Sequence, residues 1–461
     1  MYSYAEFIES KRHTTSEHGF EPLWMPDKRK LFDFQKHIAT KAIRKGRMGV
    51  FIDTGLGKTA VALTIAQNII LKTNKKVLIL TPLAVADQFL KEASEIGVDD
   101  IEHTRDGNHK NKIVVCNYER LHHLNRDDFE CVMCDESSIA KNFNNKTKFH
   151  VLEFIKKTPY RFLLSATPSP NDYVELGNSS ELLGELGYMD MLTKYFKSTQ
   201  NDFDSNSRNI GEQFRLLAHA KNDFFAWVNS WSIIIKMPSD IGFSDERYIL
   251  PELIEKHHIL KSANNIDEHG QMSLVPIIAQ TMTEVKNEQK KTDRQRCEKA
   301  VELVGDKVSV YWCNLNSESS ILKDLDPEAS EIIGSQSIDE KEEILKAFSD
   351  GEVKRLITKS SITGQGLNWQ HCNHSVFFPT WSYEQYYQSI RRFWRFGQAS
   401  DVHIDIVLTD SMKRVLKAIE EKKVKAAELY KNLMLNINRD IASNNVTEAK
   451  TLILPSFTRG A

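Results

Sequence analysis

The sequence lacks any long hydrophobic run. Its longest apolar stretches, such as Val77-Leu78-Ile79-Leu80, fall far short of the roughly 20 residues that a helix needs to cross a bilayer. The first residues, MYSYAEFIESKRH, also lack the apolar core of a signal peptide and carry acidic side chains. We therefore expect a soluble, cytoplasmic protein with no membrane partner.

Cysteine is scarce, with six residues among 461, and this excludes a disulfide framework as the main source of stability. Cys131 and Cys134 have the spacing of half a zinc site, but no second CxxC pair and no nearby CxxH completes it. Their neighbours Val132 and Met133 are apolar and favour a buried strand instead.

Neither sign of charge dominates, since 61 Lys and Arg stand against 63 Asp and Glu and give a net charge of −2. This balance excludes a polycation that coats nucleic acid, so any site for a polyanion must be a local groove. Hydrophobic residues make up 41% and charged residues 27% of the chain, which predicts a packed core. The length predicts two or three domains.

Short apolar segments alternate with helical segments in two blocks, which is typical of parallel sheets covered on both faces. A helical, aromatic stretch between about 171 and 245 separates the blocks, so we expect an α/β fold with two lobes and a helical insertion. The expected strands are 49–53, 76–81, 112–117, 129–135, 160–165, 308–313, 331–334, 353–358, 374–379 and 402–408. The expected domains are an N-terminal arm (1–30), lobe 1 (31–172), the insertion (173–247), a linker and helical brace (248–299), lobe 2 (300–410), and C-terminal helices with a tail (411–461).

A glycine-rich loop, DTGLGKT, lies between the first expected strand and a helix. Gly55 and Gly57 let backbone N–H groups approach phosphate oxygens, and the helix N-terminus adds its positive end. Lys58 would reach the outer phosphates, and the Thr59 hydroxyl would hold Mg²⁺. The loop departs from the full phosphate-loop pattern because Ile52 replaces its first glycine. The alternative is a glycine turn with an extended lysine.

Two adjacent carboxylates, Asp135 and Glu136, end another apolar strand. In a nucleotide site one would hold Mg²⁺ and the other would orient the attacking water. An acidic loop is the alternative for this segment alone. Because it follows a strand–GKT–helix unit, we interpret it as part of a nucleoside triphosphate site.

Four further segments, read in order, resemble the superfamily-two helicase core, and within it the Swi/Snf-like translocases. They are Phe34-Gln35, the run LLSATP at 163–168, the run ITGQGLNW at 362–369 and the run QSIRRFWRFGQ at 388–398. The runs DESS and WSIIIKMPSDIGF are similar to those of phage and prophage members, which would place the protein in a host cytoplasm. The resemblance covers about residues 30–410 and implies two RecA-like lobes.

The resemblance also implies roles for individual residues. Gln35 would recognise adenine and make ATP the nucleotide, and Asn368 would contribute from the second lobe. Asp135 would coordinate Mg²⁺ together with Thr59, and Glu136 would activate water. The implied nucleotide-binding set is Gln35, Thr54, Gly55, Leu56, Gly57, Lys58, Thr59, Gly364, Gly366 and Asn368; Ser165 and Thr167 would couple the ATP site to nucleic acid, and Arg392 and Arg395 would be arginine fingers.

Elementary chemistry supports the arginine fingers independently. Arg392 and Arg395 are three residues apart and share one face if the segment is helical. Cations supplied from a second lobe stabilise charge on the transferred phosphoryl group, so hydrolysis requires closure of the cleft. The role of Arg391 stays open: it either belongs to this site or is a simple surface charge.

Nucleic acid is the expected partner, with duplex DNA favoured and single-stranded DNA or RNA as alternatives. The contacts would be to the phosphodiester backbone and would read no bases. The candidates are Thr81, Pro82, Tyr118, Ser361 and Thr363.

The predicted function is an Mg-ATP-dependent motor that translocates on duplex DNA. A strand-separating DNA or RNA helicase is the first alternative. A motor subunit whose 173–247 segment docks a nuclease or methyltransferase is the second. An inactive binding protein is disfavoured because Lys58, Asp135, Glu136, Arg392 and Arg395 are all present.

Overall fold

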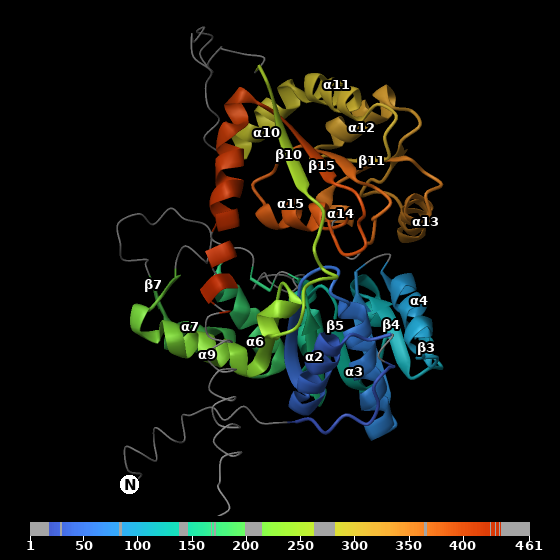
Figure 1. The fold of residues 1–461 in the computed structure, drawn as a ribbon, viewed down its shortest axis with the longest axis vertical. Coiled ribbons are helices and arrows are strands. Elements are labelled where there is room, and N and C mark those ends of the chain that lie inside the picture. The colour runs from blue at the N-terminus through green and yellow to red at the C-terminus, as the bar shows by residue number, and fades with distance from the viewer. Residues whose placement is uncertain are drawn as a thin grey trace, which may run out of the picture.

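A computed structural model describes residues 18–27, 30–82, 85–137, 146–166, 168–169, 172–198, 214–261, 282–363, 367–424, 426–428, 430–432 and 434. These residues form two α/β lobes, one built mainly from the first half of the chain and one from the second (Figure 1). The expected pair of RecA-like lobes with parallel sheets is confirmed. None of the helices within these ranges is long and apolar enough to span a membrane.

The sheet of lobe 1 is parallel throughout and has the strand order β3-β4-β2-β5-β6-β1-β9. Its strands are short runs of apolar residues, which suits a sheet that is buried on both faces. The bounds are β1 (Arg47–Ile52), β2 (Lys76–Thr81), β3 (Ile101–His103), β4 (Ile113–Asn117), β5 (Phe129–Cys134), β6 (Tyr160–Leu164) and β9 (Ser232–Ile235).

Helices cover both faces of this sheet, and β1 shows how neighbouring residues divide between them. Val50 and Ile52 pack in the core that contains α2 and α3, whereas Phe51 packs in the opposite core against Trp231 of α9. The helices of lobe 1 are α2 (Asp33–Lys45), α3 (Lys58–Thr73), α4 (Ala86–Ile96), α5 (Lys146–Ile155), α6 (Leu176–Leu183), α7 (Tyr188–Tyr195) and α9 (Lys221–Trp231).

The segment expected to be a helical insertion differs from that expectation, because it is built into lobe 1. Its helices α6, α7 and α9 cover one face of the sheet, and β9 adds a seventh strand in parallel register with β1. An antiparallel pair, β7 (Phe196–Ser198) and β8 (Phe214–Leu216), also belongs to it. The four residues of β9 are too few to show a strand period in the sequence.

Trp231 anchors this segment, and its replacement tests how firmly the segment belongs to the lobe. The indole is fully buried, with its ring centroid 6.3 Å from that of Phe51 and 5.4 Å from that of Trp227. We expect Trp231→Ala to lower the free energy of unfolding by about 3–5 kcal/mol in urea denaturation, because a large cavity remains. Trp231→Phe should lose less. A loss below about 1 kcal/mol in the alanine variant would contradict this packing.

The sheet of lobe 2 is also parallel and has the order β10-β15-β14-β11-β13-β12. The 248–299 segment, expected to be a linker and brace, supplies β10, which pairs with β15 over eight residues. Its mixed polar sequence, LIEKHHIL, is that of a half-exposed edge strand and hides the strand pattern. The bounds are β10 (Leu253–Leu260), β11 (Ser309–Trp312), β12 (Ser330–Glu331), β13 (Arg355–Thr358), β14 (His374–Phe377) and β15 (Val402–Thr409).

Two helix layers enclose this second sheet. Helices α14 and α15 lie on the side that faces lobe 1, with α11 and α12 farther away (Figure 1). The helices are α10 (Met282–Lys291), α11 (Asp293–Val304), α12 (Asn316–Leu325), α13 (Ile338–Ser349), α14 (Ser360–Thr363) and α15 (Tyr383–Ile390).

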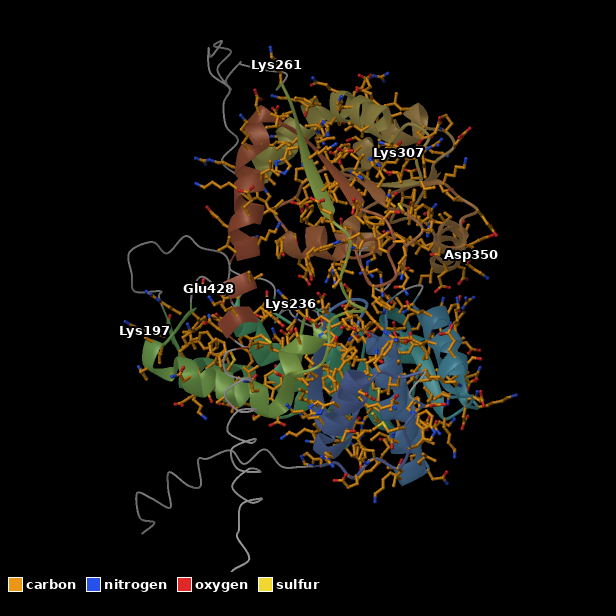
Figure 2. The ribbon with its side chains drawn as sticks, viewed as in Figure 1. Lys197, Lys236, Lys261, Lys307, Asp350 and Glu428 are labelled. Carbon is orange, nitrogen blue, oxygen red and sulfur yellow. The ribbon has the colours of Figure 1, made fainter. Side chains whose placement is uncertain are left out.

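A C-terminal helical segment that begins at residue 413 runs from lobe 2 back to lobe 1 (Figure 1). Near its end, the backbone N–H of Lys236 donates to Tyr430 Oη at 2.9 Å. The Lys236 ammonium lies 4.1 Å from the centre of the Tyr430 ring. Figure 2 shows Lys236 on lobe 1 beside the part of this segment that carries Glu428. The two lobes are therefore connected at their side as well as through the cleft.

Candidate active site

The glycine-rich loop connects β1 to α3, and both of its glycines adopt backbone angles that other residues disfavour. Gly55 has φ of 86° and Gly57 has φ of 78°, which lie in the left-handed region. A Cβ atom at Gly57 would lie 2.1 Å from Gln35 Nε2, and one at Gly55 would lie 2.9 Å from the backbone nitrogen of Phe396. Both positions therefore require glycine. Lys58 follows directly as the first residue of α3.

Gln35 holds this loop from α2. Its Nε2 atom donates to the carbonyl oxygen of Leu56 at 2.8 Å, and its Oε1 atom accepts from the backbone N–H of Phe32 at 2.9 Å. The amide is buried yet lines the cavity. It can still offer one N–H and one oxygen lone pair to a nucleobase edge.

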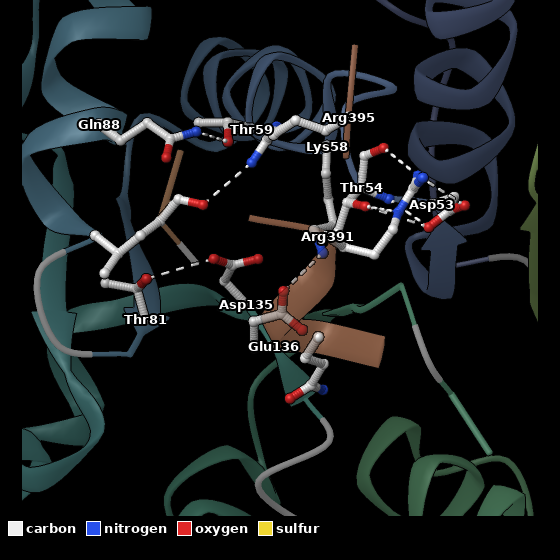
Figure 3. A network of polar contacts seen from close by, with 12 residues as sticks. Asp53, Thr54, Lys58, Thr59, Thr81, Gln88, Asp135, Glu136, Arg391 and Arg395 are labelled. Atoms are coloured by element: carbon white, nitrogen blue, oxygen red, sulfur yellow. Dashed lines mark hydrogen bonds and ion pairs between the residues drawn. The ribbon is translucent and has the colours of Figure 1, made fainter. Parts of the chain in front are cut away.

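The two carboxylates lie opposite the loop, directly after β5 (Figure 3). Lys58 Nζ forms an ion pair with Glu136 Oε1 at 3.1 Å, and Thr81 Oγ1 donates to Asp135 Oδ2 at 3.4 Å. Glu136 has φ of 48°, a left-handed conformation that glutamate rarely adopts. This uncommon backbone angle occurs at the residue predicted to act on water.

Burial shapes the electrostatics of the carboxylate pair. Desolvation raises the pKa of Asp135; Lys58 opposes this shift, and the Glu136 charge adds to it. A buried carboxylate of this kind is stabilised by a cation. The oxygen ligands that a hard cation prefers are available on Asp135 and on Thr59, whose hydroxyl accepts from Gln88 Nε2 at 3.5 Å. These residues fit Mg²⁺.

Arg392 and Arg395 enter the same site from lobe 2. They follow α15 in a turn rather than in the helix that their spacing suggested. Their Nη1 atoms donate to the carbonyl oxygen of Leu367 at 3.1 and 3.3 Å, respectively. Burial lowers the pKa of Arg392 to about 10 and that of Arg395 to about 9, so both remain cations at neutral pH.

A single cavity of about 440 Å³ brings these groups together from both lobes. Leu56, within the loop, has a buried side chain, and its carbonyl oxygen accepts a hydrogen bond from Gln35 Nε2. Gly364 and Gly366 lie outside the described residues. The predicted residues that line the cavity are Gln35, Thr54, Gly55, Gly57, Lys58, Thr59, Asp135, Glu136, Asn368, Arg392 and Arg395.

The cavity is also lined by aromatic residues that were not predicted from the sequence. The rings of Tyr248 and Phe396 are 5.0 Å apart, and those of Tyr248 and Phe32 are 5.9 Å apart. Tyr248 lies five residues after the run WSIIIKMPSDIGF (231–243) but outside it, so no motif marked it. Phe396 lies inside the QSIRRFWRFGQ run and could have been found there. Lys30, Val85, Gln88, Glu92, Glu95 and Gln370 also line the cavity and were not selected.

The residues predicted to touch nucleic acid are mostly buried, and their contact with nucleic acid stays a prediction. Tyr118 Oη donates to the carbonyl oxygen of Asp135 at 2.8 Å, and Thr81 bonds its carboxylate. The Pro82 carbonyl oxygen accepts from Asn117 at 3.2 Å. Thr363 Oγ1 lies 3.0 Å from that of Thr358, whereas Ser361 is exposed.

Two further predictions concern Ser165, Thr167 and the cysteine pair. Ser165 is buried after β6, and its N–H donates to Val50 of β1 at 3.4 Å, while Thr167 lies outside the described residues. Cys131 and Cys134 are buried in β5 but belong to opposite cores of lobe 1. Their thiols therefore face opposite sides of the sheet and cannot share one zinc ion.

Two family models match this chain. The model described as type III restriction enzyme, res subunit, matches residues 28–170, and the helicase conserved C-terminal domain matches residues 294–397. These ranges fall on lobe 1 and lobe 2, respectively. Together with the fold, they identify the chain as a superfamily-two helicase, a class of nucleic-acid-dependent ATP hydrolases.

Curated relatives agree with this class. The chain is 23% identical over 458 residues to an uncharacterized ATP-dependent helicase, YqhH, of Bacillus subtilis (strain 168), covering 87% of this chain and 79% of that protein. It is 32% identical over 154 residues to the DNA repair protein RAD5 of Yarrowia lipolytica, covering 30% of this chain but only 15% of that protein.

One solved structure shows a similar fold. Yeast (S. cerevisiae) Dbp5 bound to RNA and ADP BeF3 is similar with a TM-score of 0.56 and 12% identity, covering 87% of this chain and 93% of that chain. The Sulfolobus solfataricus SWI2/SNF2 ATPase core in complex with dsDNA has a TM-score of 0.39 and 16% identity, covering 85% and 89%, respectively.

Proposed function

We propose that this protein is a duplex DNA translocase of the Swi/Snf-like type that hydrolyses Mg-ATP between its two lobes. The observation that carries the proposal is the shared cavity, where the lobe 1 carboxylates Asp135 and Glu136 face the lobe 2 arginines Arg392 and Arg395. Neither lobe alone contains both sets of groups.

ATP would bind with its base near Gln35 and its phosphates on the glycine-rich loop. The free hydrogen-bonding capacity of the Gln35 amide suits an adenine edge, and Lys58 at the start of α3 suits the outer phosphates. Thr59 and Asp135 would hold Mg²⁺, which when bound supplies positive charge that neutralises the phosphate oxygens. Asn368 lines the same cavity and would contact the nucleotide from lobe 2.

The Lys58–Glu136 ion pair would restrain hydrolysis until ATP binds. Without nucleotide, Lys58 neutralises Glu136 at 3.1 Å. When phosphates draw the Lys58 ammonium away, its positive charge no longer opposes transfer of a proton from the attacking water to the Glu136 carboxylate. Arg392 and Arg395 then stabilise the charge of the transferred phosphoryl group. Because these arginines belong to lobe 2, hydrolysis and product release would be tied to closure and opening of the cleft.

The groove for nucleic acid would follow the carboxyl ends of the lobe 1 strands. There, Arg105 Nη2 lies 3.0 Å from Glu342 Oε2 of α13, and Arg120 Nη2 lies 3.5 Å from Asp339 Oδ1 of the same helix. Such surface ion pairs contribute little stability, so phosphate groups can replace the carboxylates. Coupling through Ser165 and Thr167 would relate this groove to the ATP site.

Arg105→Glu tests this groove. We expect about tenfold more nucleic acid to be needed for half-maximal ATPase stimulation, because a phosphate contact becomes a repulsion. Arg44→Glu is the matched control, since Arg44 is similarly exposed in an ion pair on lobe 1, at Glu21. The measurement is ATP turnover against DNA concentration at fixed salt. Equal midpoints for the two variants would contradict the placement of the groove.

Duplex DNA is favoured over other nucleic acids by the resemblance of the loop and the QSIRRFWRFGQ run to the Swi/Snf-like branch. RAD5 is a DNA repair protein by name, whereas the Dbp5 structure holds RNA, so a DNA or RNA helicase is the second candidate. A phage origin, a cytoplasmic location and a partner docked on the 173–247 segment remain further proposals.

Translocation and strand separation can be distinguished on matched substrates. We expect ATP-dependent displacement of a third strand from a DNA triplex, without separation of the underlying duplex. The Lys58→Ala protein should displace nothing. Separation of the duplex itself would favour the helicase, and activity only on addition of a copurifying nuclease or methyltransferase would favour the partner-dependent motor.

A further inference from the structure

Arg391 immediately precedes Arg392 in the sequence, and its side chain extends to Asp53 and Thr54 of lobe 1 (Figure 3). Its side chain is buried, not a surface charge. Nε donates to Thr54 Oγ1 at 2.6 Å, and Nη2 donates to the Thr54 carbonyl oxygen at 2.9 Å. Nη2 also lies 3.0 Å from Asp53 Oδ2. One lobe 2 guanidinium therefore contacts two consecutive residues at the start of the glycine-rich loop.

Asp53 is held firmly on lobe 1, so it provides a fixed target. Its backbone N–H donates to the Ile235 carbonyl oxygen of β9 at 2.9 Å, and its Oδ1 atom accepts from the Thr54 N–H at 2.7 Å. From lobe 2, Tyr387 Oη also donates to this carboxylate, at 3.1 Å from Oδ1. The carboxylate thus has partners from both lobes and little solvent.

We propose that Arg391 is a positioning residue that sets how lobe 2 docks on the glycine-rich loop. The inference rests on the proposed ATPase function and adds a role that neither the motif resemblance nor the arginine spacing assigned. Arg391 and Arg392 are adjacent, so fixing the first against Thr54 limits where the second can lie. Phe396 approaches the same loop, since a Cβ atom at Gly55 would lie 2.9 Å from its nitrogen.

The physical character of the pair suits positioning better than simple adhesion. Removing two charges from water offsets much of their attraction, so the pair adds little to the strength of closure. A misaligned closure, however, would leave Asp53 or Arg391 buried without its partner, which is strongly unfavourable. The planar guanidinium also bonds Thr54 and Asp53 at once, which a lysine ammonium does not reproduce.

The surrounding charges agree with this role. Burial by itself would lower the pKa of Arg391, but Asp53 and Tyr387 raise it. Arg395 and Lys236 are further cations whose charge interacts with Asp53. Asp53 therefore lies among several cations at the lobe boundary.

The test is a double-mutant cycle in the full-length chain with Arg391→Gln, Asp53→Asn and the double variant. We expect Arg391→Gln to lower the nucleic-acid-stimulated kcat by about 10- to 100-fold, because the arginine fingers are misplaced. The dissociation constant for ATP should change by less than about threefold, because its lobe 1 contacts remain. The double variant should turn over no more slowly than the worse single variant, since both substitutions remove the same contact and their effects should not multiply.

Controls separate this inference from the proposed function. Arg294→Gln removes a lobe 2 arginine from an exposed ion pair with Glu298 and should stay within about twofold of wild type. Arg391→Lys keeps the positive charge but loses the planar guanidinium. We expect this variant to fold and still to lose much of kcat. Independent, multiplying effects of the two single substitutions, or a loss in ATP affinity with kcat preserved, would overturn the role of Arg391. A wild-type chain without nucleic-acid-stimulated hydrolysis would instead refute the proposed function.

Discussion

Arg395→Ala is expected to lower nucleic-acid-stimulated ATP turnover by about 10³-fold or more, which is the loss typical of an arginine finger. The residue lines the cavity from lobe 2, and within the described part of the chain its Nε atom has no hydrogen-bond partner. That atom is therefore available to a developing charge on phosphate. ATP binding should persist, because the loop and Gln35 lie on lobe 1.

The measurement is steady-state kcat beside a direct binding titration with labelled nucleotide. Arg294→Ala is the control for loss of a lobe 2 arginine outside the cleft. A variant that keeps kcat and loses only ATP affinity would show that Arg395 contributes to ground-state binding rather than to the transition state.

Glu136→Gln should also lower ATP turnover strongly. The amide keeps the size of the side chain but cannot accept a proton from water, so we expect hydrolysis to fall by about 10²- to 10⁴-fold. ATP affinity should be maintained or increased, because Lys58 loses its ion-pair partner and becomes free for phosphate. ATP turnover should therefore fall while ATP affinity stays the same or rises.

A matched control lies on β5, the strand that precedes Glu136. Glu130 of β5 also pairs with a lysine, Lys75, at 2.7 Å, but the Lys75 side chain is 64% exposed, whereas both partners of the Lys58–Glu136 pair are largely buried. Glu130→Gln should leave both turnover and ATP affinity unchanged. Equal turnover in Glu136→Gln and wild type would refute the assignment of Glu136 as the group that acts on water.

Most residues of the cavity that were predicted as catalytic could be placed there from the sequence because each lies in a local motif. The loop around Lys58 joins a strand to a helix, and Asp135 and Glu136 follow an apolar strand, so parallel-sheet topology brings both to the same edge. The QSIRRFWRFGQ run supplied Arg392 and Arg395 even though they occupy a turn instead of a helix. The placement of both arginines at the cavity did not depend on that local conformation.

The remaining features depend on contacts between distant segments. Strand β9 is recognised only by its pairing with β1, and β10 is an edge strand whose polar residues resemble a loop. Tyr248 reaches the cavity from a segment without a motif. Thr81 and Tyr118 lie at strand ends, as expected, and their hydroxyls bond Asp135, a contact between distant segments that the sequence order does not reveal.

The most direct test is ATP hydrolysis by the purified full-length chain with no nucleic acid, duplex DNA, single-stranded DNA or RNA, beside Lys58→Ala. We predict strong stimulation by duplex DNA, with both basal and stimulated turnover abolished in the variant. Stimulation by single strands or RNA alone would replace the translocase with the helicase. Equal turnover under all four conditions would contradict a nucleic-acid motor.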